Sequence, residues 1–295
     1  MSKESISLIP LRARGAFAVT GAASGIGAAT TARLIAGGHN VITVDLHDAE
    51  VTCDLGTVEG RRHAVERITE LSGNVLSGLV TCAGVDTSRS LPGSRVVSIN
   101  YFGTVALLEG LRPALARAGD AAVVCVGSSS ATVIPDTPAE LLQLCLAGEE
   151  RRAGELADET GAALSYGASK AAVNLYVRHN AVKREWIGAG IRMNAVAPGF
   201  IDTPLLGEHR NGPESGQVLE TFRDATPAGR FGKPEEVAAL IDFLLGPESG
   251  FMCGSVVFAD GGLDAKFRAD HWLAVWNRPA RRVRPAVPDL TRGAA

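Results

Sequence analysis

The stretch TGAASGIG, residues 20 to 27, ends a short apolar run and opens a segment with helical spacing. Its glycines, Gly21, Gly25 and Gly27, fall at a predicted strand-to-helix turn, where missing side chains let the backbone approach a phosphate. The N-terminus of the following helix would face that anion with partial positive charge. Glycine spacing alone is weak evidence, because tight turns need glycine anyway. The stretch indicates a pyrophosphate-binding turn that the rest of the chain has to support.

Apolar runs alternate with helical patterns along the rest of the chain. We expect strands at 16–21, 40–45, 76–84, 121–130, 191–199 and 255–262, and helices at 28–38, 59–71, 96–118, 165–186 and 235–245. Such alternation calls for right-handed crossovers between parallel strands. The sequence therefore predicts an α/β fold, a single doubly wound Rossmann-type parallel sheet of about seven strands with helices on both faces. We expect this domain to span 15–263, between an N-terminal extension, 1–14, and a C-terminal extension, 264–295.

The composition argues against several classes of partner. Of 295 residues, 46% are hydrophobic and the formal net charge is -3, so no strong positive field attracts nucleic acid or an anionic membrane. The five cysteines are scattered, which indicates free thiols in a reducing compartment. Because no apolar run suits a signal peptide or a membrane span, we expect a cytoplasmic location. No histidine has metal-ligand spacing, so we expect no metal.

Asp45 closes the second predicted strand. A carboxylate there accepts hydrogen bonds from an adenosine ribose and repels a 2′-phosphate. No arginine or lysine stands at 22–24 to bind that phosphate. Asp45 therefore predicts NAD rather than NADP, although a solvated acid at a strand end is the alternative.

In SYGASK, residues 165 to 170, a tyrosine and a lysine stand one helical turn apart. Residues at i and i+4 share a helix face, so the Lys170 ammonium can lie beside the Tyr166 phenol. A neighbouring positive charge favours the phenolate and suits tyrosine to acid–base chemistry. The alternative is a solvated polar pair on an ordinary helix.

The motifs together resemble one family. Besides the glycine turn and the Tyr166–Lys170 pair, they comprise Asp54-Leu55, CAG at 82–84, Asn100, Ser128 and PGFIDT at 198–203. In this order, over roughly 15–263, they resemble the short-chain dehydrogenase/reductase family. Within the family, HDAEV, SINYFG and DGGLDA are most similar to bacterial 3α-hydroxysteroid dehydrogenases/carbonyl reductases, with coniferyl alcohol dehydrogenases as the second likeness.

The resemblance implies a role for each of four catalytic residues. Tyr166 is the acid–base, Lys170 tunes it and holds the nicotinamide ribose, and Asn100 joins a water relay behind Lys170. Ser128 binds the substrate oxygen, with Ser129 and Ser130 as alternatives. The cofactor-binding residues implied are Gly21, Ser24, Gly25, Ile26, Gly27, Asp45, Asp54, Leu55, Cys82, Ala83, Gly84, Tyr166, Lys170, Pro198, Gly199, Ile201 and Thr203.

Two features depart from the family pattern, and we also form expectations for two further segments, the stretch about 200–231 and the C-terminal extension. Thr81 and Cys82 stand where asparagines are usual, and we interpret Cys82 as a buried apolar residue. About 132–161 is an insertion, for which we expect two short helices. About 200–231 is expected to form a mobile lid over an apolar pocket, or else a surface loop. In the C-terminal extension, Trp272 and Trp276 are expected to dock on the body or on another subunit.

The function implied is hydride transfer between NAD and a hydrophobic secondary alcohol or ketone. A hydroxysteroid-like polycycle is the first expectation for the substrate, and an aromatic allylic alcohol or a natural-product ketone the second. Two alternatives are not enzymes: a regulator that senses a dinucleotide without turnover, and a structural subunit. As partners we expect a small alcohol or ketone, no nucleic acid and no membrane, within a homodimer or homotetramer.

Overall fold

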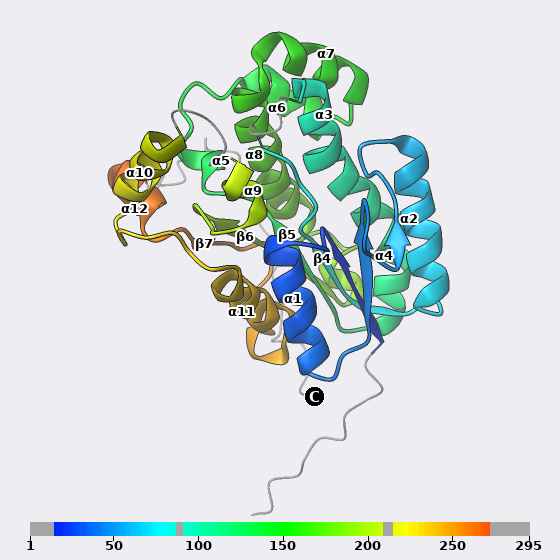
Figure 1. Ribbon diagram of the computed structural model, residues 1–295. Coiled ribbons are helices and arrows are strands. Elements are labelled where there is room, and N and C mark those ends of the chain that lie inside the picture. The colour runs from blue at the N-terminus through cyan, green and yellow to red at the C-terminus, as the bar shows by residue number, and fades with distance from the viewer. Residues whose placement is uncertain (1–14, 87–90, 209–214, 272–295) are drawn as a thin grey trace, which may run out of the picture.

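The computed structural model describes residues 15–86, 91–208 and 215–271, which form a three-layer α/β structure (Figure 1). Its seven-stranded sheet has the order β3-β2-β1-β4-β5-β6-β7, and all neighbouring strands are parallel. The strands are β1 Ala16–Thr20, β2 Val41–Asp45, β3 Val51–Thr52, β4 Leu76–Thr81, β5 Ala121–Val126, β6 Ile191–Pro198 and β7 Val256–Ala259. The predicted doubly wound fold is confirmed. Because the winding reverses between β1 and β4, the carboxyl ends of these two strands border the crevice where such folds bind ligands.

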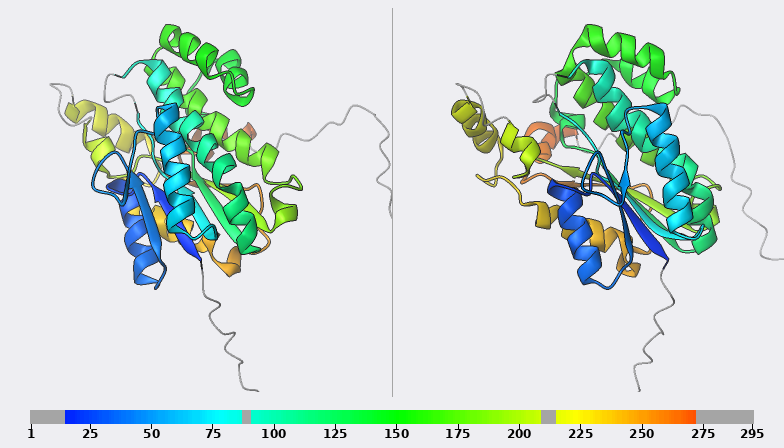
Figure 2. Two further views of the ribbon diagram at one scale, coloured as in Figure 1. Left: turned by 90° about the vertical axis from the view of Figure 1, so that its right-hand side faces the viewer. Right: turned by 45° about the vertical axis from the view of Figure 1, so that its right-hand side comes forward.

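Helices cover both faces of the sheet (Figure 2). One face carries α1 Gly25–Ala36 and α11 Pro234–Leu245, and the other carries α2 Val58–Leu71, α4 Thr104–Ala118 and α8 Ala162–Asn180. Side chains of a strand alternate between the two faces, so neighbouring residues of β5 enter different cores: Val123 packs under α4 and α8, and Val124 under α1 and α11. Both faces of the central strands are therefore dry, and the strands read as continuous apolar runs.

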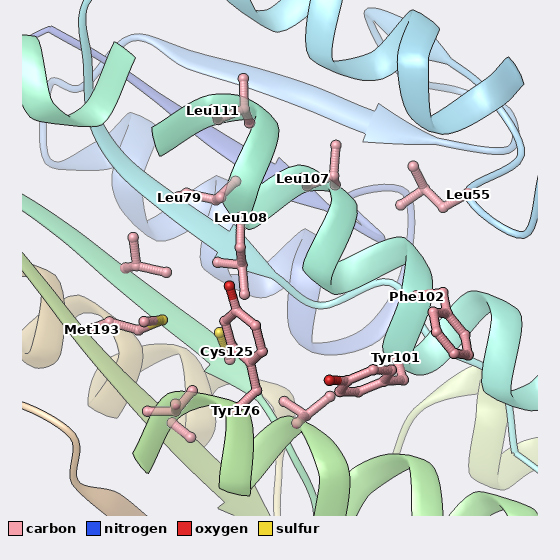
Figure 3. Close-up of a cluster of buried hydrophobic side chains, with 14 of the residues drawn as sticks. Leu55, Leu79, Tyr101, Phe102, Leu107, Leu108, Leu111, Cys125, Tyr176 and Met193 are labelled. Atoms are coloured by element: carbon pink, nitrogen blue, oxygen red, sulfur yellow. The ribbon is translucent and has the colours of Figure 1, made fainter. Parts of the chain in front are cut away.

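The larger core lies between the sheet and α4 with α8 (Figure 3). Leu107, Leu108 and Leu111 line the buried face of α4, each with no exposed surface. Tyr176 of α8 is 7% exposed, and its hydroxyl donates to the carboxylate of Glu109. A long section of α8 is thereby fixed against the sheet, which makes this helix a rigid support for side chains at its other end.

The helix expected at 96–118 is present within a continuous helical stretch from 93 to 118, but a π-helical segment that was not predicted changes its register. The chain forms α3 Gly93–Val97, then a π-helical segment η1 Ser98–Gly103, and then α4. Asn100 lies inside the π-helical segment and is 1% exposed. Insertions of this kind shift the register of a helix and are frequent at functional sites.

The helix expected at 165–186 instead spans Ala162–Asn180. Trp186 lies beyond it, with no exposed surface, at the start of the short helix η2 Ile187–Ala189. A fully buried tryptophan in a loop extended the apolar periodicity past the true end of the helix, which explains the error.

The insertion contains α6 Ala139–Leu146 and α7 Glu150–Thr160, so the two expected helices are confirmed. A further turn of helix, α5 Ser130–Val133, precedes them. Buried side chains of α6, among them Leu141 and Cys145, join the larger core. The insertion is therefore packed onto the body of the protein and is not a peripheral loop.

The segment expected to form a lid contains α9 Pro204–Glu208 and α10 Ser215–Ala225, and its motion stays a prediction. The remaining elements are η3 Pro247–Ser249, α12 Leu263–Arg268 and η4 Ala269–His271. Trp272 and Trp276 lie outside the described residues. Within those residues, no helix has the length and apolar character needed to cross a bilayer, and the cytoplasmic location stays a prediction.

Candidate active site

The glycine turn between β1 and α1 is packed too closely for side chains. Gly21 has φ +65, and a Cβ built there would lie 2.8 Å from the backbone nitrogen of Ala83. A Cβ on Gly27 would lie 2.0 Å from the carbonyl oxygen of Gly21. The turn is therefore fixed against the end of β4, and the first amides of α1 face the crevice.

Asp45 lies at the end of β2, beside the glycine turn. Its Oδ2 accepts a hydrogen bond from the backbone nitrogen of Ala23 at 2.9 Å, and its Oδ1 accepts one from that of Leu46 at 2.7 Å. A carboxylate has further lone pairs available. Asp45 is therefore oriented by backbone donors and still able to accept bonds from a bound hydroxyl.

A cavity of about 210 Å³ runs along this edge of the sheet. Eleven of the predicted cofactor residues line it: Gly21, Ser24, Gly25, Ile26, Gly27, Asp45, Leu55, Cys82, Ala83, Gly84 and Thr203. Asp54 does not. Its carboxylate pairs with Arg95 at 2.8 Å and accepts a bond from the nitrogen of Gly56 at 2.8 Å. Asp54 thus holds the loop after β3, and its predicted part in cofactor binding stays a prediction.

A second cavity of about 110 Å³ adjoins the first and shares Ile26, Cys82 and Gly84 with it. The remaining predicted cofactor residues line this one: Tyr166, Lys170, Pro198, Gly199 and Ile201. Burial raises the pKa of the Cys82 thiol to about 12, so this wall residue stays protonated and unreactive.

Lys170 is buried at the inner end of the second cavity. The residue is 5% exposed, and its Nζ donates to the carbonyl oxygen of Val126 at 3.0 Å and lies 5.9 Å from the centre of the Tyr166 ring. The two side chains lie on the same side of α8 and both face the cavity, as their spacing predicts. Burial lowers the pKa of the Lys170 ammonium to about 8, because a dry environment disfavours charge.

The expected lowering of the Tyr166 pKa is not seen, and that expectation was wrong for this structure. Burial raises the pKa of the phenol above its ordinary value. The nearby hydroxyls of Ser128 and Ser130 oppose the rise, and the negative charge of Asp86 adds to it. Tyr166 is therefore held as a neutral proton donor.

Three serines follow β5, and their surroundings differ. The Oγ of Ser128 accepts a hydrogen bond from the nitrogen of Ser130 at 3.1 Å, and Ser128 lines the Tyr166 cavity. The nitrogen of Ser129 donates to Pro198, which ties the loop to the end of β6. The Oγ of Ser130 is buried and makes no hydrogen bond of normal geometry. All three serines line the outer cavity described below, and Ser128 also lines the cavity at Lys170, so the choice of Ser128 stays a prediction.

Asn100 fixes the loop that follows β4. Its Oδ1 accepts from the nitrogen of Val85 at 2.8 Å, and its Nδ2 donates to the carbonyl oxygen of Val85 at 2.9 Å and to the Oγ of Ser169 at 3.2 Å. A Cβ on Gly84 would lie 3.1 Å from Asn100 Oδ1 and 3.3 Å from Lys170 Nζ. Asn100 thus links β4 to α8 directly behind Lys170, and its part in a water relay stays a prediction.

A third cavity, of about 300 Å³, lies on the outer side of Tyr166 and Ser128. Its walls are mostly apolar and include Phe200 and Phe222, whose rings stack with centres 4.2 Å apart. The other apolar lining residues are Val133, Ile134, Ala163, Ile201, Leu205, Leu206 and Leu263. Sequence reasoning missed Phe200, although it directly follows the Pro198-Gly199 pair, and it missed Asp86 at the edge of the same cavity.

Residues 16–136 match the family model described as short chain dehydrogenase, and residues 153–264 match the model described as Enoyl-(Acyl carrier protein) reductase. Galactitol 2-dehydrogenase (L-tagatose-forming) of Cereibacter sphaeroides is 30% identical over 83% of this chain and 93% of the relative. The chain belongs to the short-chain dehydrogenase/reductase family, whose members use nicotinamide cofactors, and it is an oxidoreductase of CH–OH groups.

Within the family, the chain is similar to hydroxysteroid dehydrogenases. The 3-alpha-hydroxysteroid dehydrogenase/carbonyl reductase of Comamonas testosteroni is 38% identical over 253 residues, which is 85% of this chain and 96% of the relative. The crystal structure of the 3-alpha-hydroxysteroid dehydrogenase from Pseudomonas sp. B-0831 complexed with NADH aligns with a TM-score of 0.80 and 46% identity, covering 86% of this chain and 98% of that one. The predicted family, and the likeness to bacterial 3α-hydroxysteroid dehydrogenases/carbonyl reductases, are confirmed.

Proposed function

We propose that this enzyme transfers hydride between NAD and a hydrophobic secondary alcohol or ketone, with a hydroxysteroid-like polycycle as the first substrate class. One observation carries the proposal: Tyr166 and Ser128 line both the 110 Å³ cavity beside Lys170 and the apolar 300 Å³ cavity. A substrate oxygen bound there would reach the phenol and the serine from the apolar side. The cofactor would enter from the opposite side, along the glycine turn.

We assign the residues of the two adjoining cavities to different parts of the dinucleotide. The 210 Å³ cavity at the glycine turn would hold the adenosine and pyrophosphate, and the cavity at Lys170 would hold the nicotinamide. Asp45 supports NAD over NADP, because its negative charge would face an added 2′-phosphate. The crystal structure of the Pseudomonas relative contains NADH, which supports the choice of NAD over NADP for this enzyme.

The chain's own groups account for the proton. NAD, when bound, supplies the hydride acceptor for oxidation, and NADH the donor for reduction. In reduction, the neutral phenol of Tyr166 donates a proton to the carbonyl oxygen that Ser128 orients. In oxidation the phenolate takes that proton back, so the raised Tyr166 pKa should make oxidation faster at alkaline pH. Lys170, still mostly protonated at neutral pH with a pKa of about 8, stabilises the phenolate.

The apolar lining of the outer cavity supports a polycyclic substrate. The stacked Phe200 and Phe222 offer a flat wall, and Leu206 closes the side next to α9. A panel of steroid, aryl and alicyclic secondary alcohols, followed by NADH absorbance, tests the class. Highest kcat/KM for the steroids supports the first choice, whereas preference for an aromatic allylic alcohol supports the second. The predicted homodimer or homotetramer is part of this proposal and requires sedimentation analysis.

Replacing Tyr166 by phenylalanine separates an enzyme from a dinucleotide sensor. Tyr166→Phe removes the proton donor and leaves the cavity shape, so turnover should fall by about 10³-fold or more while NADH still binds. Tyr176→Phe is the matched control, because it makes the same change on the same helix at a hydroxyl that faces Glu109. If the Tyr166→Phe variant retains its turnover, Tyr166 is not the acid–base residue.

A further inference from the structure

The insertion is joined to the wall of the cofactor cleft through an ion pair between a buried arginine and a glutamate whose side chain is 33% exposed. Arg61 of α2 has a side chain only 8% exposed, and it meets Glu150, the first residue of α7. The contact is bidentate: NH1 donates to Oε2 at 2.7 Å and NH2 to Oε1 at 2.6 Å. Fork-to-fork pairing of this kind fixes the plane of the guanidinium as well as its position.

The same guanidinium also holds two backbone carbonyls. Its Nε donates to the oxygen of Leu55 at 2.7 Å, and its NH2 donates to the oxygen of Ser98 at 3.0 Å. Ser98 opens the π-helical segment, where the shift in register leaves a carbonyl in need of another donor. The hydroxyl of Ser98 donates to Glu150 in turn. Arg61 therefore donates four hydrogen bonds to three groups: the Leu55 carbonyl, the Ser98 carbonyl and the Glu150 carboxylate.

One carbonyl belongs to a residue that lines the cofactor cleft, and the other to the residue just before one that does. Leu55 and Ile99, the residue after Ser98, line the 210 Å³ cavity opposite the glycine turn. Neither side chain is charged, and together they form an apolar surface against which a flat base can pack. The distance between the two walls is thus set by where Arg61 holds Leu55 and Ser98.

We propose that Arg61 and Glu150 form a positioning pair, through which the inserted helices set the wall that receives the adenine ring. The inference rests on the proposed function, since it assumes that a dinucleotide occupies the cleft. Neither residue touches the cleft itself: Arg61 acts through Leu55 and Ser98, and Glu150 acts through Arg61. The insertion therefore contributes to cofactor affinity although its helices lie outside the sheet.

Electrostatics explains why a carboxylate is needed at residue 150. A buried guanidinium without a carboxylate partner is strongly unfavourable. Without Glu150, Arg61 should therefore move toward water and lose its hydrogen bonds to the carbonyls of Leu55 and Ser98. The Arg61 bonds and the Ser98 hydroxyl lower the pKa of Glu150, although burial opposes this, so the pair stays charged at neutral pH. The two arginines beside this loop differ: the Arg61 side chain is 8% exposed, whereas that of Arg95, which pairs with Asp54, is 36% exposed and more accessible to solvent.

Two ligands distinguish positioning from general stability. NADH carries an adenosine, and reduced nicotinamide mononucleotide lacks it, so only NADH should sense the Leu55 wall. Binding is measured by tryptophan quenching and by ligand fluorescence, without any need for turnover. In Glu150→Gln we expect the Kd for NADH to rise on the order of tenfold, with the Kd for the mononucleotide unchanged within about twofold.

Glu155→Gln is the matched control on the same helix, because Glu155 is 61% exposed and pairs with the exposed Arg151. Its Kd for both ligands should equal that of the original chain. Glu150→Asp, which retains the charge on a shorter side chain, is the second variant should the glutamine variant fold poorly, and it should give a smaller loss of the same kind.

The outcomes separate the inference from the proposed function. An unchanged Kd for NADH in Glu150→Gln and Glu150→Asp overturns the positioning role, and so does an equal loss for NADH and the mononucleotide. If the original chain binds neither ligand, the proposed function itself fails. Loss confined to NADH supports both.

Discussion

At the adenosine end of the cleft the contacts come from backbone and from partly exposed side chains, whereas at the chemical end they come from buried side chains. The glycine turn and Asp45 occupy adjacent loops, and Asp45 is oriented by the amides of Ala23 and Leu46. Lys170 and Asn100 are 5% and 1% exposed and are held by bonds that link β4, β5 and α8.

The difference separates binding from chemistry. Every residue other than proline has a backbone N–H and C=O that can form hydrogen bonds. Ligand binding at the adenosine end therefore depends mainly on small residues, such as the glycines of the turn, that let the ligand approach the backbone. The chemical end depends on ionisable groups that are buried away from water. Burial makes their pKa values sensitive to neighbouring charges, and it lowers the free energy of unfolding. Changes at the chemical end should therefore alter turnover strongly, and changes at the adenosine end should alter affinity and cofactor choice.

The largest effect should follow from Lys170→Met, which keeps the length of the side chain and removes its charge. Without the ammonium, the phenolate loses its stabilising neighbour, and kcat should fall by about 10³-fold. The variant should still bind NADH, but with lower affinity, because the expected contact of Lys170 with the nicotinamide ribose is lost. Lys183→Met, at an exposed lysine just beyond the same helix, is the control and should leave turnover unchanged. Steady-state kinetics that show a loss below about tenfold would contradict the role of Lys170.

The same variant should be more stable than the original chain at neutral pH. The pKa of Lys170 is about 8 in the fold, against an ordinary value of 10.5. Between these values the unfolded chain binds more protons than the folded chain, so stability rises with pH across this window and the full penalty applies below it. The penalty is at most about 3 kcal/mol, less what the bond to Val126 contributes.

Urea unfolding of Lys170→Met and the original chain, measured from pH 7 to pH 10, tests this sign. The advantage of the variant should be largest near pH 7 and shrink as pH rises. A difference that is constant across the range would mean that Lys170 is not buried as an ammonium, and would weaken the contrast between the two ends. Lys183→Met should show no such trend, because its lysine is exposed in the fold.

The parts of the site that could be predicted are those in which neighbouring residues decide the geometry. The glycine turn is such a part, because a short run of residues contains both the turn and the helix start. Tyr166 and Lys170 are another, since one helical turn fixes their relation. The parallel, doubly wound sheet followed from the alternation of strands and helices, through the handedness of parallel crossovers.

The parts that could not be predicted depend on contacts between distant segments. The π-helical register at Asn100 is held by Arg61, which lies on another helix, and no local pattern indicates it. The raised pKa of Tyr166 reflects burial under loops whose conformation the sequence does not specify. Asp54 was assigned to the cofactor from its position in a motif, but its carboxylate turns to Arg95.

The smallest effect should come from the adenosine end, where Asp45→Asn removes the charge and leaves the size of the side chain. The amide oxygen can still accept one bond from Ala23 or Leu46, so the turn should persist. Repulsion of a 2′-phosphate disappears, while the ribose hydroxyls lose an ionised acceptor. The ratio of Kd for NADP to Kd for NAD should fall by about tenfold, with kcat at saturating cofactor changed by less than about twofold.

Glu50→Gln makes a matched change for this measurement, because it removes an exposed acid near the same end of the sheet. Its ratio should not move, since a charge outside the cleft is screened by solvent. If both variants shift the ratio equally, cofactor choice depends on the general negative field of this edge and not on the Asp45 carboxylate. If neither shifts it, the adenosine end chooses its ligand by shape, and the contrast drawn with the charge-dependent chemical end becomes sharper.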